Sequence, residues 1–318
     1  MHYSLAMRVA LVTPYLPEVR NGNAHTAVRW RSFLRQAGHR VDMVLNWDGE
    51  PAEAMIALHA RRSHASIARF AKAHPERPLI LVLTGTDLYR DIRFDTDAQM
   101  SLKLAHVLVV LQGEGTAEIP AAYQDKVRVI HQSAPTLVPQ PRPVRHFSVG
   151  VVAHLREEKD PFRAVMALRR LPRSSRVHLW HVGGELQPGL AVEAEALSRI
   201  EPRWNWLGSR PHGQTRRRIG RSHLLVVPSL MEGGANVICE AVTVATPVLA
   251  SHIHGNVGML GKDYVGYFPP GDEQALADLM LRATADAGFY QHLARQCALR
   301  APLFAPEREA AAVQALVP

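Results

Sequence analysis

The sequence predicts an α/β protein made of two doubly wound parallel sheets that face each other across a cleft. Short apolar runs alternate with helical patterns along the chain, which is typical of parallel sheets. The alternation stops in a proline-rich stretch at 134–143 and then starts again. The length of 318 residues suits two domains better than one. In such sheets ligands bind beyond the carboxyl ends of the strands.

The first half begins with an apolar run and a helix. After Gly22 and Asn23, Ala27, Trp30 and Leu34 fall on one helical face together with Ala37, and Gly38 is a typical stop. The predicted strands of this half are 8–13, 40–45, 55–59, 79–83, 107–111 and 127–130.

The second half repeats the pattern, with helices predicted at 161–170 and 213–221. Asp160 is predicted as the N-cap of the first of these helices and Pro161 as its first residue. The predicted strands are 147–153, 177–182, 204–207, 224–227, 248–251 and 265–268. We therefore expect domains at 1–140 and 141–300, and a final helix in 301–318 that packs back on the first domain.

Composition narrows the class of protein. The chain is 47% apolar and 21% charged, as is usual for soluble proteins, and no apolar run is long enough to cross a bilayer. Residues 1–7 do not resemble a signal peptide, and two cysteines are too few for a disulfide framework, so we expect a cytoplasmic protein. The net charge of +8 fits a solvated arginine surface or a positive cleft for anionic small molecules. We expect neither a nucleic-acid nor a membrane partner.

The most informative segment is 228–241. A strand leads to a turn with Gly233 and Gly234 and then to a helix, and exposed N–H groups at a helix start attract phosphate. Glu232 and Glu240 flank that turn and can accept hydrogen bonds from hydroxyl groups. The segment therefore predicts a ligand that is part phosphate and part sugar.

A second loop, 153–160, carries Arg156 and Lys159 between a strand and a helix. Both side chains could neutralise a diphosphate; alternatively, both are ordinary surface cations.

These segments resemble the family 4 glycosyltransferases of the GT-B fold, which has two Rossmann-like domains. The family's Pro-Ser…Glu-Gly…Glu-Ala segment is similar to 228–241, with seven residues between the glutamates, and its Pro-Gly-Asp is similar to 270–272. The basic pair of the family matches Arg156 and Lys159 loosely. The usual Glu-Gly-Phe-Gly reads Glu-Gly-Gly-Ala at 232–235, and a glycine pair reads Gly22 and Asn23. Both departures could retune the sugar pocket.

The resemblance implies a metal-independent enzyme that uses a UDP-sugar and needs no cofactor. It implies that Arg156 and Lys159 hold the diphosphate and that Glu240 binds the ribose. Glu232 would meet the donor sugar with help from the amides of Gly233, Gly234, Ala235 and Asn236. Gly208, Ser209 and Arg210 would face the base.

The closer resemblance is to selenosugar synthases of selenoneine biosynthesis, through stretches at 13–14, 22–26, 57–63 and 83–89. It implies that a hexosyl group passes from UDP-N-acetylglucosamine or UDP-glucose to selenophosphate, with UDP released. The alternatives are a glycosyltransferase with a hydroxyl acceptor, a GT-B epimerase or hydrolase that uses water on the same donor, and a nucleotide-sugar sensor. The preferred hexose, the anomeric outcome and the oligomeric state stay open.

Selenophosphate is an anionic nucleophile that needs a cationic site more than a general base. Arg61 and Arg62 supply guanidiniums after a predicted strand, and Ser63 is predicted to cap the next helix. We place Asn23, Thr84 and Asp87 with them as acceptor-binding residues; Asp87 could instead serve as a base or a turn residue. His25 could donate to a departing phosphate or to a selenophosphate oxygen.

Overall fold

The computed structural model describes residues 6–15, 22–138 and 140–317, which form two compact units. Unit 1 comprises Met1–Ser133, Glu232–Ala235 and Ala305–Pro318, and unit 2 comprises Ala134–Met231 and Asn236–Phe304. The predicted N-terminal segment 1–7 and the predicted linker 134–143 lie partly outside the described residues. The rest of the predicted linker belongs to unit 2.

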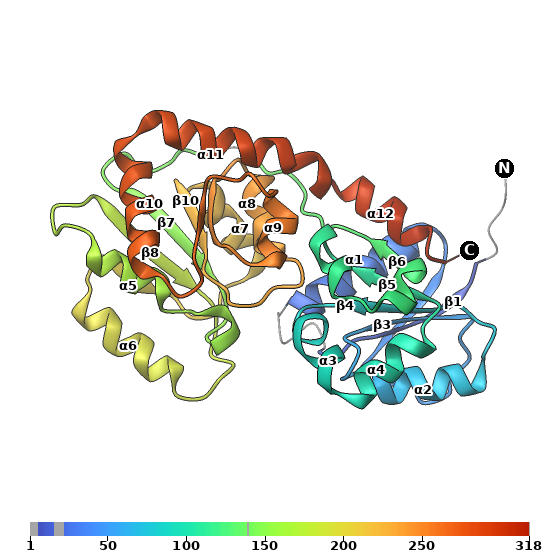
Figure 1. Ribbon diagram of the computed structural model, residues 1–318. Helices are drawn as coiled ribbons and strands as arrows, with labels where there is room; N and C mark the ends of the chain where they lie inside the picture. Colours follow the sequence, from blue (N-terminus) through green and yellow to red (C-terminus); the bar gives the residue numbers. More distant parts are fainter. Residues whose placement is uncertain (1–5, 16–21, 139, 318) are drawn as a thin grey trace. The chain divides into compact units, whose positions relative to one another are not determined.

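Unit 1 is built on a six-stranded parallel sheet in the order β2-β1-β3-β4-β5-β6 (Figure 1). Its strands are β1 Arg8–Val12, β2 Arg40–Val44, β3 Ala54–Leu58, β4 Leu79–Leu83, β5 Val107–Val110 and β6 Val127–Val129. Its helices are α1 Gly22–Gln36, α2 His64–Ala73, α3 Ile92–Phe94, α4 Thr96–Leu104 and α12 Pro306–Gln314, with a π-helical turn Asp87–Asp91 and 3₁₀ turns Gly113–Glu118 and Ala121–Lys126.

Alternation along the strands of unit 1 builds a core on each face of the sheet, because neighbouring side chains point to opposite sides. On one face Leu11 and Ile56 pack with Trp30 of α1 and Val313 of α12. On the other face residues such as Leu81 pack with Ile67 and Phe70 of α2 and with Leu102 of α4. Right-handed crossovers explain why α1 and α2 cover opposite faces.

Unit 2 repeats the design with the strand order β12-β11-β10-β7-β8-β9, again all parallel (Figure 1). Its strands are β7 Phe147–Val152, β8 Val177–Val182, β9 Trp204–Trp206, β10 Leu224–Val227, β11 Val248–Ser251 and β12 Tyr267–Phe268. Its helices are α5 Arg163–Arg170, α6 Leu190–Ile200, α7 His212–Gly220, α8 Asn236–Val242, α9 His254–Leu260, α10 Glu273–Ala285 and α11 Ala287–Arg300, with 3₁₀ turns Glu157–Lys159 and Ala301–Phe304.

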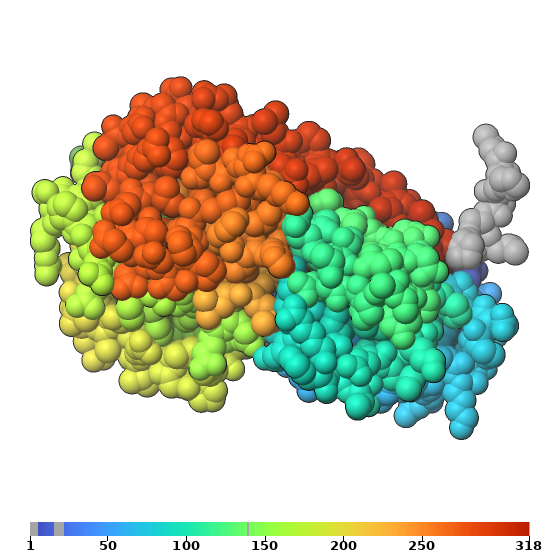
Figure 2. Space-filling model, in the orientation of Figure 1, coloured from blue at the N-terminus to red at the C-terminus, as the bar shows by residue number. Residues whose placement is uncertain are grey.

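The strand order of unit 2 decides which helices share a face. The chain moves outward from β7 through β8 to β9, and then crosses back to β10. Right-handed connections therefore place α5 and α6 on one face and α7, α8 and α9 on the other (Figure 1). The residues of α10 and α11, coloured orange to red, form much of the visible surface of unit 2 (Figure 2).

The predicted fold class of two doubly wound parallel sheets is confirmed, and every predicted strand is present within two residues of its expected ends. One prediction about a helix start is wrong. Helix α5 begins at Arg163, and the N-cap position is held by Phe162 instead of Asp160. Asp160 instead has a left-handed backbone, with φ of 43°, and its carboxylate accepts a 2.8 Å hydrogen bond from Arg163.

The C-terminal helix α12 is fastened to unit 1 by a buried carboxylate that the sequence does not mark. Glu309 is 1% exposed and accepts hydrogen bonds from Trp30 Nε1 at 2.8 Å and from the guanidinium of Arg29 at 2.7 and 3.0 Å. The backbone N–H of Ser133 donates to the same carboxylate at 2.8 Å. A buried charge of this kind is stable only when every partner is present.

We expect Glu309→Ala to lower the free energy of unfolding by about 3 kcal/mol or more, because three buried donors lose their acceptor. The matched control is Glu307→Ala, which removes an exposed carboxylate from the same helix and should change stability by less than about 0.5 kcal/mol. Urea unfolding followed by tryptophan fluorescence measures both. Equal effects in the two variants would contradict the assigned role of Glu309.

Candidate active site

In unit 2, glycines let the loops at the carboxyl ends of β7, β8 and β9 touch through their backbones. A Cβ atom on Gly183 would lie 1.7 Å from the carbonyl oxygen of Ala153, and one on Gly184 would lie 2.4 Å from Ser209 Oγ. The N–H of Gly183 donates to the carbonyl of Gly208 at 3.0 Å. Only glycine fits at 183, where the clash is with backbone, and the Ser209 side chain lies against Gly184 in the loop after β8.

The two residues predicted to bind the diphosphate lie at a 3₁₀ turn after β7. Arg156 precedes the turn Glu157–Lys159, and Lys159 ends it. The Nε of Arg156 is buried and donates no hydrogen bond within the described residues, while its side chain lies 4.0 Å from the carboxylate of Glu158. The backbone carbonyl of Glu158 accepts from Leu230 N–H at 2.9 Å, which ties this turn to the loop after β10.

Glu240, the residue predicted to bind the ribose, is held by a histidine that sequence reasoning missed. Glu240 lies on α8, is 9% exposed, and its Oε1 is 2.6 Å from Nε2 of His212 at the start of α7. Arg216, on the buried side of α7, has its pKa lowered by burial, and the charge of Glu240 opposes that shift. His212 and Glu240 are 28 positions apart, so no local pattern links them.

The segment Glu232–Ala235 belongs to unit 1. A Cβ on Gly233 would lie 2.4 Å from the carbonyl oxygen of Thr84, and one on Gly234 would lie 2.7 Å from Leu111 Cβ. The side chain of Gln132 donates to the carbonyl of Gly234 at 3.1 Å. The glycine at 234 is therefore required by close packing at this point.

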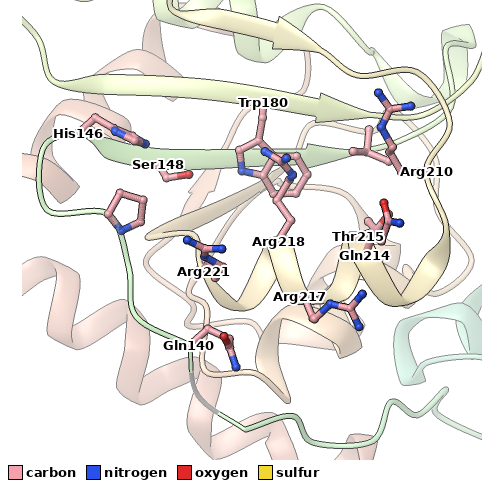
Figure 3. A pocket seen from close by; sticks show the side chains of 12 residues that line it. Gln140, His146, Ser148, Trp180, Arg210, Gln214, Thr215, Arg217, Arg218 and Arg221 are labelled. Atoms are coloured by element: carbon pink, nitrogen blue, oxygen red, sulfur yellow. The ribbon is translucent and has the colours of Figure 1, made fainter.

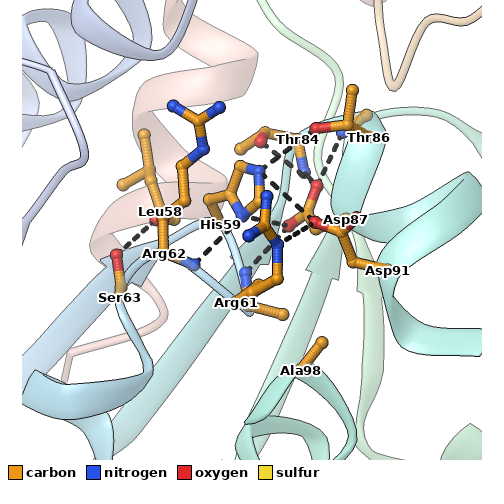
Figure 4. Close-up of polar contacts among 12 residues, drawn as sticks. Leu58, His59, Arg61, Arg62, Ser63, Thr84, Thr86, Asp87, Asp91 and Ala98 are labelled. Atoms are coloured by element: carbon orange, nitrogen blue, oxygen red, sulfur yellow. Dashed lines mark hydrogen bonds and ion pairs between the residues drawn. The ribbon is translucent and has the colours of Figure 1, made fainter. Parts of the chain in front are cut away.

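Most predicted acceptor residues gather after β3 and β4 in unit 1 (Figure 4). Asp87 is fully buried, and its carboxylate accepts 2.9 Å hydrogen bonds from the backbone N–H groups of Ala60, Thr84 and Gly85. With these bonds Asp87 joins the loop after β3 to the loop after β4. Asn23 and His25 are half-buried in the first turn of α1 and do not belong to the loops after β3 and β4.

The two predicted arginines have different surroundings. Arg61 Nε donates to Asp91 at 2.9 Å, and this hydrogen bond raises the pKa of Arg61. Arg62 packs over the ring of Tyr15 and donates to its hydroxyl, with no carboxylate partner among the described residues. Arg62 is therefore the better candidate for binding an added anion.

The prediction that the Ser63 side chain caps α2 is wrong. Ser63 occupies the N-cap position, but its hydroxyl donates to the carbonyl of Leu58 at 2.6 Å. That bond closes the turn after β3, so the hydroxyl stabilises the loop instead of the helix.

His59 is a further residue that sequence reasoning missed. It adopts a left-handed backbone with φ of 75° and is 3% exposed, while its Nε2 lies 3.1 Å from Thr86 Oγ1. A non-glycine residue in this conformation costs about 1–3 kcal/mol and is common at ligand sites. It follows β3 within the motif 57–63, but the backbone angle has no sequence signal.

Neither a metal cluster nor a spanning helix is found within the part of the chain that is described. Residues 6–15, 22–138 and 140–317 contain no group of three or more His, Cys, Asp or Glu side chains placed to hold a metal ion. The same residues form no helix that is long and apolar enough to cross a bilayer.

The two parallel α/β units have the GT-B fold, and the family match reported next makes the protein a glycosyltransferase. The chain belongs to the family described as glycosyl transferases group 1, whose model matches residues 139–299, half of its length.

Solved structures similar to the whole chain support the fold. Sucrose-phosphate synthase from Thermosynechococcus elongatus has a TM-score of 0.79 at 16% identity, covering 97% of this chain and 98% of that one. HepE of Anabaena, solved with UDP and glucose, has a TM-score of 0.74 at 17% identity, covering 97% of both chains. A glycosyltransferase from Rickettsia africae has a TM-score of 0.72 at 13% identity, covering 98% of this chain and 99% of that one.

The loop after β7 depends on a histidine that stays neutral. His181 is fully buried, and its Nε2 lies 2.8 Å from the carbonyl oxygen of Ala153, so this nitrogen carries the proton. Burial lowers the pKa of His181 to about 4. The unfolded chain, with a histidine pKa near 6.5, binds more protons than the folded one between those values.

We therefore expect stability to fall as the pH drops from about 6.5 to 4, with His181 contributing up to about 3 kcal/mol of that loss. The variant His181→Gln keeps a donor for the Ala153 carbonyl but does not titrate, so its unfolding free energy should depend less on pH in this window. Urea unfolding at several pH values measures the two slopes. Identical slopes would contradict a neutral buried His181.

Proposed function

We propose that this protein is a cytoplasmic selenosugar synthase that transfers a hexosyl group from a UDP-sugar to selenophosphate. The selenium atom attacks the anomeric carbon and forms a C–Se bond. The bond from that carbon to the β-phosphate oxygen breaks, and its electron pair leaves with UDP. Chemistry of this kind needs an anion site for each substrate and little help from a base.

The donor half of the proposal rests on unit 2. Arg156 and Lys159 share one short turn, and the Nε of Arg156 is a buried donor without a bond among the described residues. Glu240 is held by His212 and is available to accept from ribose hydroxyls. We assign the base to the loop with Ser209 and Arg210. The similar HepE structures include complexes with UDP and with UDP-glucose, which supports a uridine nucleotide donor here.

The acceptor half rests on one observation, the bonding of Asp87. Its carboxylate accepts from three backbone N–H groups and is fully buried, so it is poorly suited to take a proton from a hydroxyl acceptor. Arg62, in the loop after β3 to which Asp87 is bonded through Ala60, offers a guanidinium without a carboxylate partner in the described chain. A cation without a base favours an acceptor that is already an anion.

The remaining predicted residues take supporting roles in this proposal. We assign His25 to an oxygen of the departing or attacking phosphate, and Glu232 with Gly233, Gly234, Ala235 and Asn236 to the donor sugar and its phosphate. Asn23 and Thr84 would bind the acceptor, while Ser63 holds the turn that carries Arg62.

The deciding experiment measures UDP release from UDP-N-acetylglucosamine and UDP-glucose, each with selenophosphate, with inorganic phosphate, with glucose or fructose 6-phosphate as a hydroxyl acceptor, and with no acceptor. We expect release only with selenophosphate, together with a selenium-containing sugar detected by mass. Release with a hydroxyl acceptor alone would support a conventional glycosyltransferase instead. Release without any acceptor would support use of water.

Lys159→Ala should lower the turnover number at least about a hundredfold, because a fixed cation at the departing diphosphate is worth a few kcal/mol in the transition state. Lys262→Ala removes the same charge from an exposed loop position and should keep near-normal turnover. Initial rates of UDP release compare the two. Near-normal activity in Lys159→Ala would refute its role.

Arg62→Ala should raise the KM for selenophosphate about tenfold or more while leaving the KM for the UDP-sugar nearly unchanged, because only the acceptor loses a charge-assisted bond. Arg61→Ala breaks the ion pair with Asp91 and should instead lower the melting temperature. A rise in the KM for the UDP-sugar in Arg62→Ala would place this arginine with the donor.

A further inference from the structure

Unit 2 contains a pocket of about 450 Å³ whose lining shares one residue, Arg210, with the roles assigned above (Figure 3). It lies between α7 and the sheet, and the segment before β7 forms a third side. Pockets of 300–1,000 Å³ are the usual size for small-molecule sites. The lining residues used below come from α7, from β7 and β8, and from the start of unit 2: Gln140, His146, Ser148, Trp180, Arg217, Arg218 and Arg221.

The basic residues of the pocket form one stripe along α7. Arg217 and Arg218 lie three and four positions after Gln214, and Arg221 follows one further turn on. Residues three and four apart on a helix are neighbours, so these guanidiniums lie within about one turn of each other. Arg216, which directly precedes Arg217, is buried instead, and its guanidinium donates to the carbonyl of Pro135. The stripe therefore gives the lining three positive charges, more than a single monoanion would neutralise.

These charges are not balanced by carboxylates. The pocket lining contains no Asp or Glu, and none of Arg217, Arg218 and Arg221 forms an ion pair within the described residues. Arginines elsewhere in unit 2 do form such pairs, as Arg163 does with Glu273 at 2.5 Å and Arg203 with Glu201 at 2.9 Å. A helix C-terminus favours cations, which accounts for basic residues here but not for a hollow beside them.

The wall of the pocket is held in place before any ligand binds. Trp180 lies directly over Gly150, where an added Cβ would be 2.3 Å from the indole ring. Its Nε1 donates to Ser222 Oγ at 2.9 Å, and the guanidinium of Arg218 lies over the ring at 5.6 Å from the centroid (Figure 3). Because Trp180 is already fixed, no entropy is lost in ordering this wall when an anion binds.

The pocket is separate from the predicted donor residues of the same unit. Ser148 lies near the start of β7, and Arg221 follows the end of α7. Arg156 and Lys159 follow the carboxyl end of β7, about 15 Å further along at the usual rise per strand residue. Arg210, which also lines the pocket, belongs to the loop that we assign to the base and is left out of the test below.

We propose that this pocket binds a phosphorylated small molecule carrying at least two negative charges, at a site distinct from the donor site. Arg217, Arg218 and Arg221 provide the charge-assisted hydrogen bonds, and Ser148 and Gln214 provide neutral ones. Nucleic acid is disfavoured because the stripe of arginines spans about one helical turn, whereas a strand needs an extended basic groove.

The test measures binding of inorganic tripolyphosphate by isothermal titration calorimetry to the full chain with saturating UDP, which occupies the donor site. We expect one further site on the unmodified protein. The variant carrying Arg217→Gln, Arg218→Gln and Arg221→Gln should bind at least tenfold more weakly. All three side chains are exposed, so the fold should survive, and its melting temperature checks that.

The matched control carries Arg169→Gln, Arg173→Gln and Arg295→Gln, three exposed arginines of unit 2 outside the pocket. It has the same net charge as the pocket variant and should bind within about twofold of the unmodified protein. Equal weakening in both variants would overturn the proposal, because the effect would then come from overall charge. Absence of binding, or tighter binding of a 20-nucleotide single-stranded RNA through the same arginines, would overturn it as well.

Discussion

The structure depends on how each loop is held where a parallel strand stops. A strand that ends leaves N–H and C=O groups without ladder partners, and buried backbone groups must find others. In unit 1 the carboxylate of Asp87 takes three such N–H groups, and Ser63 bonds the carbonyl of Leu58. In unit 2 Gly183 bonds Gly208 directly, while His181 holds the carbonyl of Ala153. These hydrogen bonds in the loops, and not those between the strands, place the side chains that we expect to meet a ligand.

The sheets were predictable because their signal is local. A run such as 79–83 or 177–182 is apolar, rich in branched residues and bounded by loops, so the strands β4 and β8 match their predicted ends. The start of α5 was not predictable in the same way. Asp160 and Pro161 have good local preferences for a helix start, but Asp160 bonds Arg163 and takes a left-handed turn. A different local contact, between side chains three positions apart, replaced the predicted cap there.

The sequence could predict which residues belong to the candidate site, but not which contacts each of them makes. Arg61 and Arg62 are adjacent arginines that the sequence does not distinguish. In the structure Arg61 forms an ion pair with Asp91, whereas Arg62 packs over Tyr15. Asp87 looks like an exposed turn aspartate and is in fact buried. His212 and Glu309 carry no local signal, because their partners are 28 and 280 positions away. Side chains so far apart in sequence meet because of the chain topology, and neither composition nor residue spacing reveals that topology.

The return of α12 to unit 1 affects the order in which the protein can fold. The ribosome finishes residues up to Ser133 long before it reaches Ala305, because nearly all of unit 2 is made between them. At ordinary elongation rates that interval lasts on the order of ten to thirty seconds. Throughout it, part of the apolar face that contains Leu11 and Ile56 lacks Val313, and Arg29 and Trp30 lack their carboxylate. A nascent chain of this protein therefore has all six N-terminal strands but leaves part of one apolar face of their sheet open to chaperones while the second unit is being made.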